Sequence, residues 1–287
     1  MPGASLGGQG WLRDLPDVRD FDPSTPAVRD VLSRLKRRRG RNAPRPAAVD
    51  HGEFLAETQV FDPPESAART TGVDSAAALV RYFERRATGR IVDLAPRFLY
   101  YTARRLDELA GDTGISLRTV WKALVRFGCP PLRFGPSPTA PLDAEPGALA
   151  FAYQREFAGL QYVRLDPPGV AGSALLERIK AFVAAGFACV CGCMLAPPAG
   201  DDVDIPYPTK LAGATLGTTL VVVGYDDQQR IRSSHGALVV RTTFGGAGRG
   251  RLARLPYRYV ETGLACDVWT LLKPEWLAGG EFEQPAA

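Results

Sequence analysis

Cysteine and histidine are scarce in this chain of 287 residues. It contains five cysteines, none of them before Cys129, and two histidines, His51 and His235. An odd number of cysteines in a chain of this length does not suggest a framework of disulfides. The first 128 residues also contain no thiol that could act as a nucleophile.

Long apolar runs are missing as well. No segment approaches the ~18 consecutive apolar residues that a membrane-spanning helix needs. Residues 1–14 have neither the basic start nor the apolar stretch of a secretory signal. We therefore expect a cytoplasmic protein with reduced thiols that makes no contact with a membrane.

The net charge of +4 comes from one basic run between residues 34 and 45. Its seven members are Arg34, Lys36, Arg37, Arg38, Arg39, Arg41 and Arg45. Without them 28 basic residues face 31 acidic ones, so the rest of the chain has a charge of −3. No aromatic residues are interleaved in the run, which favours a solvated helix end and linker over a nucleic-acid surface. Nucleic-acid binding is therefore the weakest of the functions considered.

Hydrophobic periodicity divides the chain into a helical first half and a strand-rich second half. Helices are predicted at 72–87, 93–109 and 116–127, the last capped by Ser116, and at 173–185. Strands are predicted at 158–165, 187–195, 218–224, 237–243 and 268–272. Helices followed by strands are typical of an α+β protein with two lobes.

Three groups of residues could suggest a metal or phosphate site, but each favours a simpler interpretation. Cys189, Cys191 and Cys193 alternate along a predicted strand, which puts the outer two ~13 Å apart and too far for one zinc ion. Asp201, Asp202 and Asp204 lack the glycine and glutamate of a calcium loop. The glycine-rich segment 245–250 does not lead into a helix. We predict no metal and no cofactor.

Several short segments occur in the order known from one family. They are Gly10–Asp20, Val49-Asp50, Phe98–Tyr101, Gly111–Gly114, Gln161–Pro168, Val223–Asp227, Leu255–Tyr259 and Trp269. Together they resemble the bacterial branch of the papain-like cysteine peptidases over roughly residues 10–275.

The resemblance implies the papain-like, two-lobed cysteine peptidase fold. It would have an N-terminal, propeptide-like extension at 1–45 and a papain-like domain at 46–275. Within that domain we expect a helical lobe at about 46–140 and a strand-rich, barrel-like lobe at about 141–275. Residues 276–287 would then form a flexible tail.

The catalytic positions that the resemblance implies are occupied by other residues. The family's cysteine begins the first long helix, where the helix N-terminus and a histidine lower its pKa. The alignment without gaps places Thr71 there, and a shifted one places Asp74 or Ser75. The remaining positions of the family's site are Thr218 for the histidine, Thr242 for the asparagine, Phe244 for the aromatic after it, and the vicinity of Glu65 for the oxyanion glutamine.

These replacements predict a pseudopeptidase that is not an enzyme and has no catalytic residues. It would be a binding, scaffolding or assembly protein for a protein or peptide, using the former cleft. The cleft residues would be Thr71, Asp74, Thr218, Thr242 and Phe244, and an extended peptide would bind there by strand addition.

The alternative is a divergent hydrolase or acyl transferase that uses other groups, such as Asp74 with His235. A histidine within ~3 Å of Thr71, Asp74 or Ser75 would favour this alternative.

Overall fold

The computed structural model describes residues 10–36, 45–55, 71–137, 139–196, 203–210, 216–242 and 251–285. Several residues singled out in the sequence lie outside these ranges. They are Glu65, Phe244, Arg37–Arg41, Asp201, Asp202 and the glycine-rich segment 245–250.

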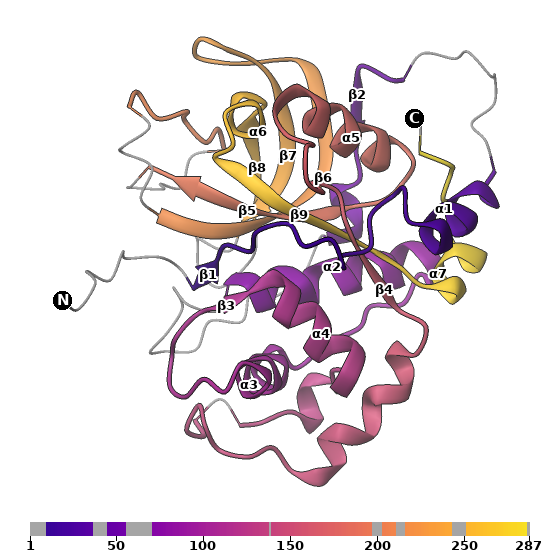
Figure 1. Ribbon diagram of the computed structural model, residues 1–287, viewed down its shortest axis with the longest axis vertical. Coiled ribbons are helices and arrows are strands. Elements are labelled where there is room, and N and C mark those ends of the chain that lie inside the picture. Colours follow the sequence, from indigo (N-terminus) through magenta and orange to yellow (C-terminus); the bar gives the residue numbers. More distant parts are fainter. Residues whose placement is uncertain are drawn as a thin grey trace.

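A seven-stranded antiparallel sheet occupies one end of the molecule with α5 and α6 beside it, and α3 and α4 lie toward the other end (Figure 1). The strands follow the order β4-β9-β5-β6-β7-β8, and β2 adds to β6. Their bounds are β2 Ala48–Asp50, β4 Gln161–Arg164, β5 Cys189–Leu195, β6 Leu216–Ile231, β7 Ser234–Thr242, β8 Arg251–Pro256 and β9 Ala265–Leu272. β6 is the longest strand and pairs with β5, β7 and β2.

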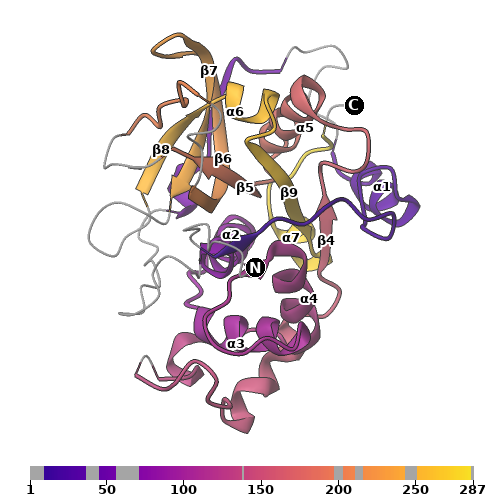
Figure 2. The same ribbon diagram turned by 60° about the vertical axis from the view of Figure 1, so that its left-hand side comes forward.

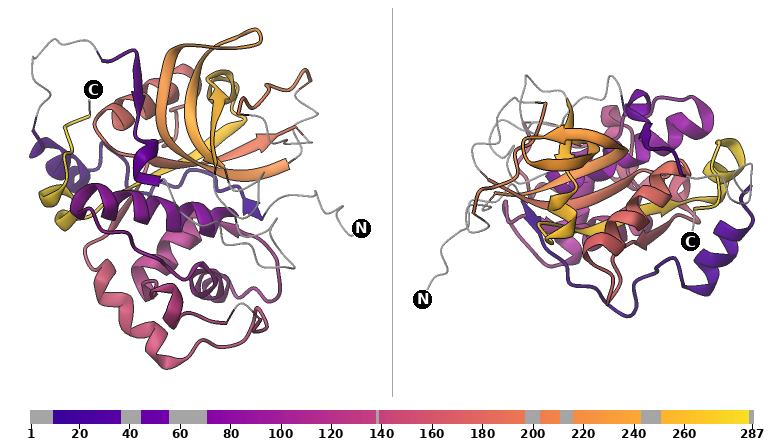
Figure 3. Two further views of the ribbon diagram at one scale, coloured as in Figure 1. Left: turned by 180° about the vertical axis from the view of Figure 1, so that it is seen from behind. Right: turned by 90° about the horizontal axis from the view of Figure 1, so that it is seen from above.

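The helical lobe is built from α2 (Thr71–Thr88), α3 (Pro96–Leu106) and α4 (Leu117–Phe127). α2 lies between the sheet and the other two helices, as the view from behind shows most clearly (Figure 3). Fourteen of its eighteen residues are buried, which its alanine-rich sequence permits because small side chains allow close packing on every side.

The remaining elements pack around these two lobes. They are β1 Trp11–Leu12, α1 Pro26–Ser33, η1 Gly52–Leu55, β3 Ile115–Ser116, η2 Leu132–Phe134, η3 Ala148–Phe157, α5 Gly172–Ala184, α6 Arg258–Glu261 and α7 Pro274–Gly279. The predicted cap of α4 is present, because Ser116 Oγ accepts a hydrogen bond from the Thr119 N–H.

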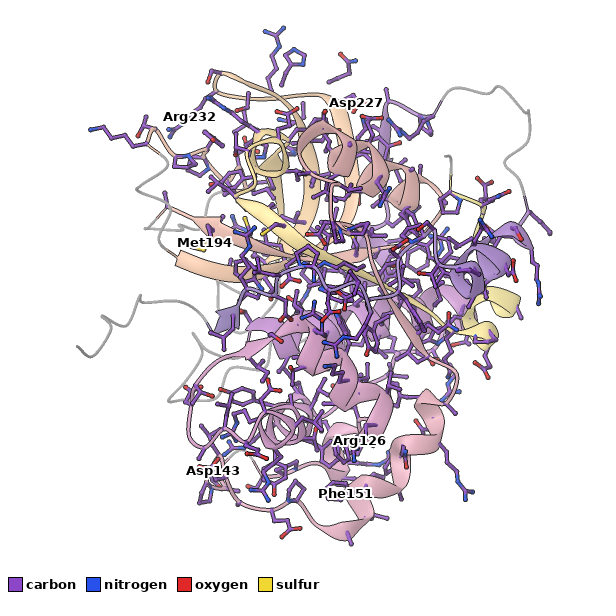
Figure 4. All side chains as sticks on the ribbon, viewed as in Figure 1. Arg126, Asp143, Phe151, Met194, Asp227 and Arg232 are labelled. Carbon is purple, nitrogen blue, oxygen red and sulfur yellow. The ribbon has the colours of Figure 1, made fainter. Side chains whose placement is uncertain are left out.

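Two segments pack differently from the expected division of the chain. Residues 148–157, predicted to belong to the strand-rich lobe, lie among the helices, where the Phe151 ring contacts Phe98 and Phe127 (Figure 4). At the C-terminus, where a flexible tail was expected, Trp276 and Phe282 stack on Phe83 in the core. Large aromatic side chains account for both differences, because their packing against other rings fixes the backbone that carries them.

The observed architecture confirms the predicted α+β class, with a helical lobe and a strand-rich lobe.

No helix in the part of the chain that the structure describes is both long enough and apolar enough to cross a membrane.

Candidate functional site

The first turns of α2 are fastened to the sheet by two buried polar contacts. Arg241 Nη1 on β7 donates to Asp74 Oδ2 at 2.9 Å, and both side chains are 1% exposed. Thr219 Oγ1 on β6 donates to Ser75 Oγ at 2.9 Å. Thr71 lies one turn earlier on the same face of α2, because residues three and four apart on a helix are neighbours.

The three threonines at the implied catalytic positions are all enclosed. Thr71, Thr218 and Thr242 are 2%, 0% and 3% exposed. Among the residues that the structure describes, Thr218 Oγ1 has no hydrogen-bond partner, whereas Thr242 Oγ1 donates to the Arg251 carbonyl at 3.4 Å. Neighbouring residues of a strand point to opposite faces, so Thr219, not Thr218, directs its side chain to α2.

Arg241 was missed by the sequence-based reasoning, although a signal was present. It directly follows Ala237–Val240, the apolar run of this strand. A charged residue in a strand that is buried on both faces needs an opposite charge beside it. Asp74, in the first turns of a helix of small apolar residues, was the acid that could supply it.

Neither histidine reaches the N-terminus of α2. His51 Nε2 contacts the Val183 carbonyl at 3.1 Å, and its Nδ1 lies 3.4 Å from Arg86. Burial and the Arg86 charge lower the pKa of His51. Arg86 is twelve residues along α2 from Asp74, a separation of ~18 Å.

His235 is exposed and pairs with Arg230 beside the β6–β7 turn. It lies six residues, or ~20 Å, along β7 from Arg241, the partner of Asp74. The predicted alternative of Asp74 acting with His235 is therefore wrong, because His235 and Arg241, which holds Asp74, lie toward opposite ends of β7.

All five cysteines are buried free thiols. Burial raises the pKa of Cys129 to about 12 and that of Cys266 to about 11, so both are neutral at physiological pH. The three cysteines of β5 are likewise buried, and burial raises their pKa values. Within the described residues, no three histidine, cysteine, aspartate or glutamate side chains are grouped so that they could hold a metal ion.

An N-terminal segment, residues 11–22, runs across the junction of the two lobes and is called the strap below (Figures 1 and 2). Its β1 part pairs in parallel with β3, Trp11 opposite Ile115. The Trp11 indole lies against Gly192 on β5 and near Gly217 on β6, next in sequence to Thr218. A Cβ at Gly192 would overlap the indole, so glycine is required there.

The strap is held by a group of buried and partly buried charges, called the strap cluster: Asp14, Asp20, Asp166, Asp267, Arg118 and Arg164. Asp267 accepts hydrogen bonds from Trp11 Nε1 at 2.9 Å and from Trp269 Nε1 at 2.7 Å. Arg164 lies 3.3 Å from Asp267, and burial raises the pKa of Asp267 to about 6. With four carboxylates and two guanidiniums, the cluster is rich in acid.

Arg118 and Arg164 link the strap to the rest of the cluster. Arg118 on α4 binds Asp14 at 2.9 Å and Asp20 at 2.7 Å. Arg164 on β4 lies 3.0 Å from Asp166 and 3.6 Å from Asp20. Residues from the strap, α4, β4, the turn after β4 and β9 are thus tied together at the junction.

No protein-family model matches this sequence, and no curated protein matches it. Solved structures do. Xylellain, a cysteine protease from Xylella fastidiosa, is 23% identical with a TM-score of 0.69, over 95% of this chain and 98% of that one. Procathepsin L2 from Tenebrio molitor is 14% identical with a TM-score of 0.62, over 93% of this chain and 78% of that one.

A third match is the bromelain protease from Ananas comosus, 14% identical with a TM-score of 0.52, over 79% of this chain and 99% of that one. These neighbours contradict the prediction that the chain is not an enzyme, because the proteins that share its architecture are cysteine proteases. The replacement of the family's cysteine, histidine and asparagine by Thr71, Thr218 and Thr242 remains a prediction from the resemblance, and it does not exclude activity. The chain has the papain-like cysteine protease fold.

Proposed function

We propose that this protein binds an extended polypeptide segment at the junction of its two lobes. The observation that carries the proposal is the position of Trp11, whose indole fills a slot over Gly192 and beside Gly217. The junction thus already holds an extended segment of this same chain, anchored by one aromatic side chain.

The surroundings of the slot suit a peptide. Parallel pairing of β1 with β3 satisfies backbone groups of the bound segment, as strand addition requires. Asp267 accepts the indole N–H, so a tryptophan is recognised both by shape and by its single donor. The slot lies beside Thr218, which the family resemblance aligns with the catalytic histidine of papain-like peptidases.

Under this proposal, Thr218 and Thr242 occupy the former histidine and asparagine positions, and Thr71 or Asp74 the former cysteine position. The ion pair between Asp74 and Arg241 supports the second choice, because it joins the start of α2 to the residue next to Thr242. The partner would be a protein or peptide that offers an extended segment with an aromatic anchor.

The test removes the Trp11 indole from the slot by mutation and then offers a peptide that could occupy it. Trp11→Ala is incubated with a fluorescein-labelled peptide of residues 10–22, and binding is measured by fluorescence polarisation. We expect Trp11→Ala to bind the peptide, and the wild type, whose slot is occupied, to bind it far more weakly. The matched control is Trp11→Ala with Gly192→Ala, in which the added methyl group fills the slot and should abolish binding.

A second peptide, in which alanine replaces tryptophan, controls for the anchor. If folded Trp11→Ala bound neither peptide, or bound both equally, the proposed binding mode would be wrong. Mass spectrometry of the recovered peptide distinguishes two functions: an intact peptide supports binding alone, whereas a cut peptide supports hydrolysis by groups other than the family's triad.

A further inference from the structure

A hollow of about 380 Å³ lies between α1 and α5, on the side of the molecule where the C-terminal segment passes (Figure 1). Two backbone hydrogen bonds of that segment tie the ends of the two helices together. The Gln284 N–H donates to the Lys36 carbonyl after α1 at 3.0 Å, and the Glu283 N–H donates to the Ala185 carbonyl at the end of α5 at 2.9 Å. The hollow is thus enclosed by fixed backbone, and its volume is that of a small-molecule site.

Four charged side chains line the hollow, and three of them are arginines. Arg29 comes from α1, Arg178 from α5 and Arg45 from the segment before β2, whereas Glu177 is the single carboxylate. Glu177 Oε2 pairs with Arg45 Nη2. Within the described residues, Arg29 and Arg178 pair with no carboxylate. The hollow therefore has a surplus of two positive charges.

This surplus does not follow from the overall charge of the chain. Outside the basic run of residues 34–45, the chain has 31 acidic and 28 basic residues. Arg45 is the last member of that run, so the one strongly basic stretch of the sequence ends at the hollow. Guanidiniums around one space repel each other, and an anion placed between them would remove this repulsion.

Arg178 is already oriented by the protein. Its Nη1 donates to the Leu165 carbonyl at 3.1 Å, which fixes one N–H of the guanidinium. The remaining N–H groups form a planar fork that matches two oxygens of one anionic group. Pro23, Ala174 and Pro285 add apolar surface to the lining. The hollow therefore suits a ligand that combines a compact anion with a small apolar body.

We propose that this hollow binds a small phosphate monoester, with its phosphate between Arg29 and Arg178. A phosphate monoester has a charge of about −1.5 to −2 at pH 7, which matches the surplus, whereas a carboxylate or a sulfate ester has about half of it. A nucleic acid is a poorer occupant, because the one aromatic residue of the lining, Phe182, is 3% exposed and cannot stack on a base.

This site is independent of peptide binding at the lobe junction. None of the residues that line the hollow belongs to the Trp11 slot or to the strap cluster. A failure of one proposal would therefore leave the other standing.

Isothermal titration calorimetry of the full chain with phenyl phosphate tests the proposal. The matched ligand is phenyl sulfate, which has nearly the same shape but a single negative charge. At about pH 7.5 and low ionic strength, phenyl phosphate should bind about tenfold more tightly than phenyl sulfate. At about pH 5 this preference should disappear, because the second pKa of a phosphate monoester is about 6 and the ligand then has a single charge.

Substitution of the two arginines tests the position of the phosphate. Arg29→Gln and Arg178→Gln should each increase the dissociation constant of phenyl phosphate about tenfold, since each removes a charge-assisted contact. Arg90→Gln, at an exposed arginine in the α2–α3 connection, is the matched control and should bind like the wild type. Arg29 is also exposed, so its replacement should leave the fold intact, which circular dichroism checks.

Four results would overturn the proposal. The first is a wild type that does not bind phenyl phosphate, and the second is equal binding of phenyl sulfate at about pH 7.5. The third is binding to Arg29→Gln and Arg178→Gln that is as tight as binding to Arg90→Gln. The fourth is tighter binding of a single-stranded oligonucleotide at equal phosphate concentration, weakened by the same two substitutions, which would assign the hollow to nucleic acid.

Discussion

The two buried polar groups at the lobe junction differ in how their charges are balanced. Between α2 and β7, one acid and one base, Asp74 and Arg241, face each other with 1% exposure. Under the strap, four carboxylates share two guanidiniums and several N–H donors. In the Asp74–Arg241 pair each buried charge faces one opposite charge, whereas the strap cluster can redistribute its contacts and take up a proton.

The largest expected effect comes from breaking the Asp74–Arg241 pair. Asp74→Ala leaves the Arg241 guanidinium buried without its carboxylate, so the free energy of unfolding should fall by about 3 to 5 kcal/mol. Urea denaturation measures this change. Asp74→Leu combined with Arg241→Met should lose much less, because no charge remains buried. A double variant as unstable as the single one would show that packing, not charge, dominates here.

The strap cluster should respond to pH. Burial raises the pKa of Asp267 to about 6, above the ~3.9 of an unfolded aspartate. Between these values the folded chain binds the proton more tightly, so this contribution to the free energy of unfolding decreases as pH rises from about 4 to about 6. A shift of this size corresponds to at most about 3 kcal/mol.

Asp267→Asn is the variant for this measurement, since asparagine tolerates the φ of +56° at this position. Denaturation between pH 4 and pH 7 should show a shallower decline than in the wild type. Part of the slope should remain, because burial also raises the pKa of Asp166. An unchanged slope would assign the pH dependence to other groups.

Filling the slot that holds the Trp11 indole should cause a smaller and more local loss of stability. Gly192→Ala places a methyl group where the Trp11 indole now lies. The overpacking should lower the free energy of unfolding by about 1 to 3 kcal/mol. Tryptophan fluorescence and proteolysis within residues 12–21 would report displacement of the strap. At Gly217 the nearest atoms to an added Cβ are 3.4 Å and 3.6 Å away, so Gly217→Ala should leave the strap in place.

The smallest effect is expected outside the cluster. Arg19 binds Asp17 at 2.5 Å, but its side chain is 85% exposed, and water and salt screen such a pair. Arg19→Ala should therefore leave the midpoint of urea denaturation unchanged. A clear loss of stability would mean that this pair belongs to the strap cluster.

Much of the fold could be predicted from local patterns. The alanine-rich periodicity of 72–87 and the serine cap at 116 correspond to α2 and α4, and the Val-rich run 218–224 lies within β6. These features depend on residues close together in the sequence, so a single sequence contains them. The candidate site could be predicted only in part, because the resemblance identified positions 71, 74, 218 and 242 but not their contacts.

The sequence by itself determined the α+β class, the order of the papain-like segments, and the absence of a cysteine before residue 129. Tertiary structure alone decided that Arg241 pairs with Asp74, 167 residues away. It also decided that Asp267 accepts the hydrogen bond of the Trp11 indole N–H, 256 residues away. It also decided that Trp276 and Phe282 end in the core. Contacts of this kind depend on how strands and helices meet in space, and no local periodicity encodes them.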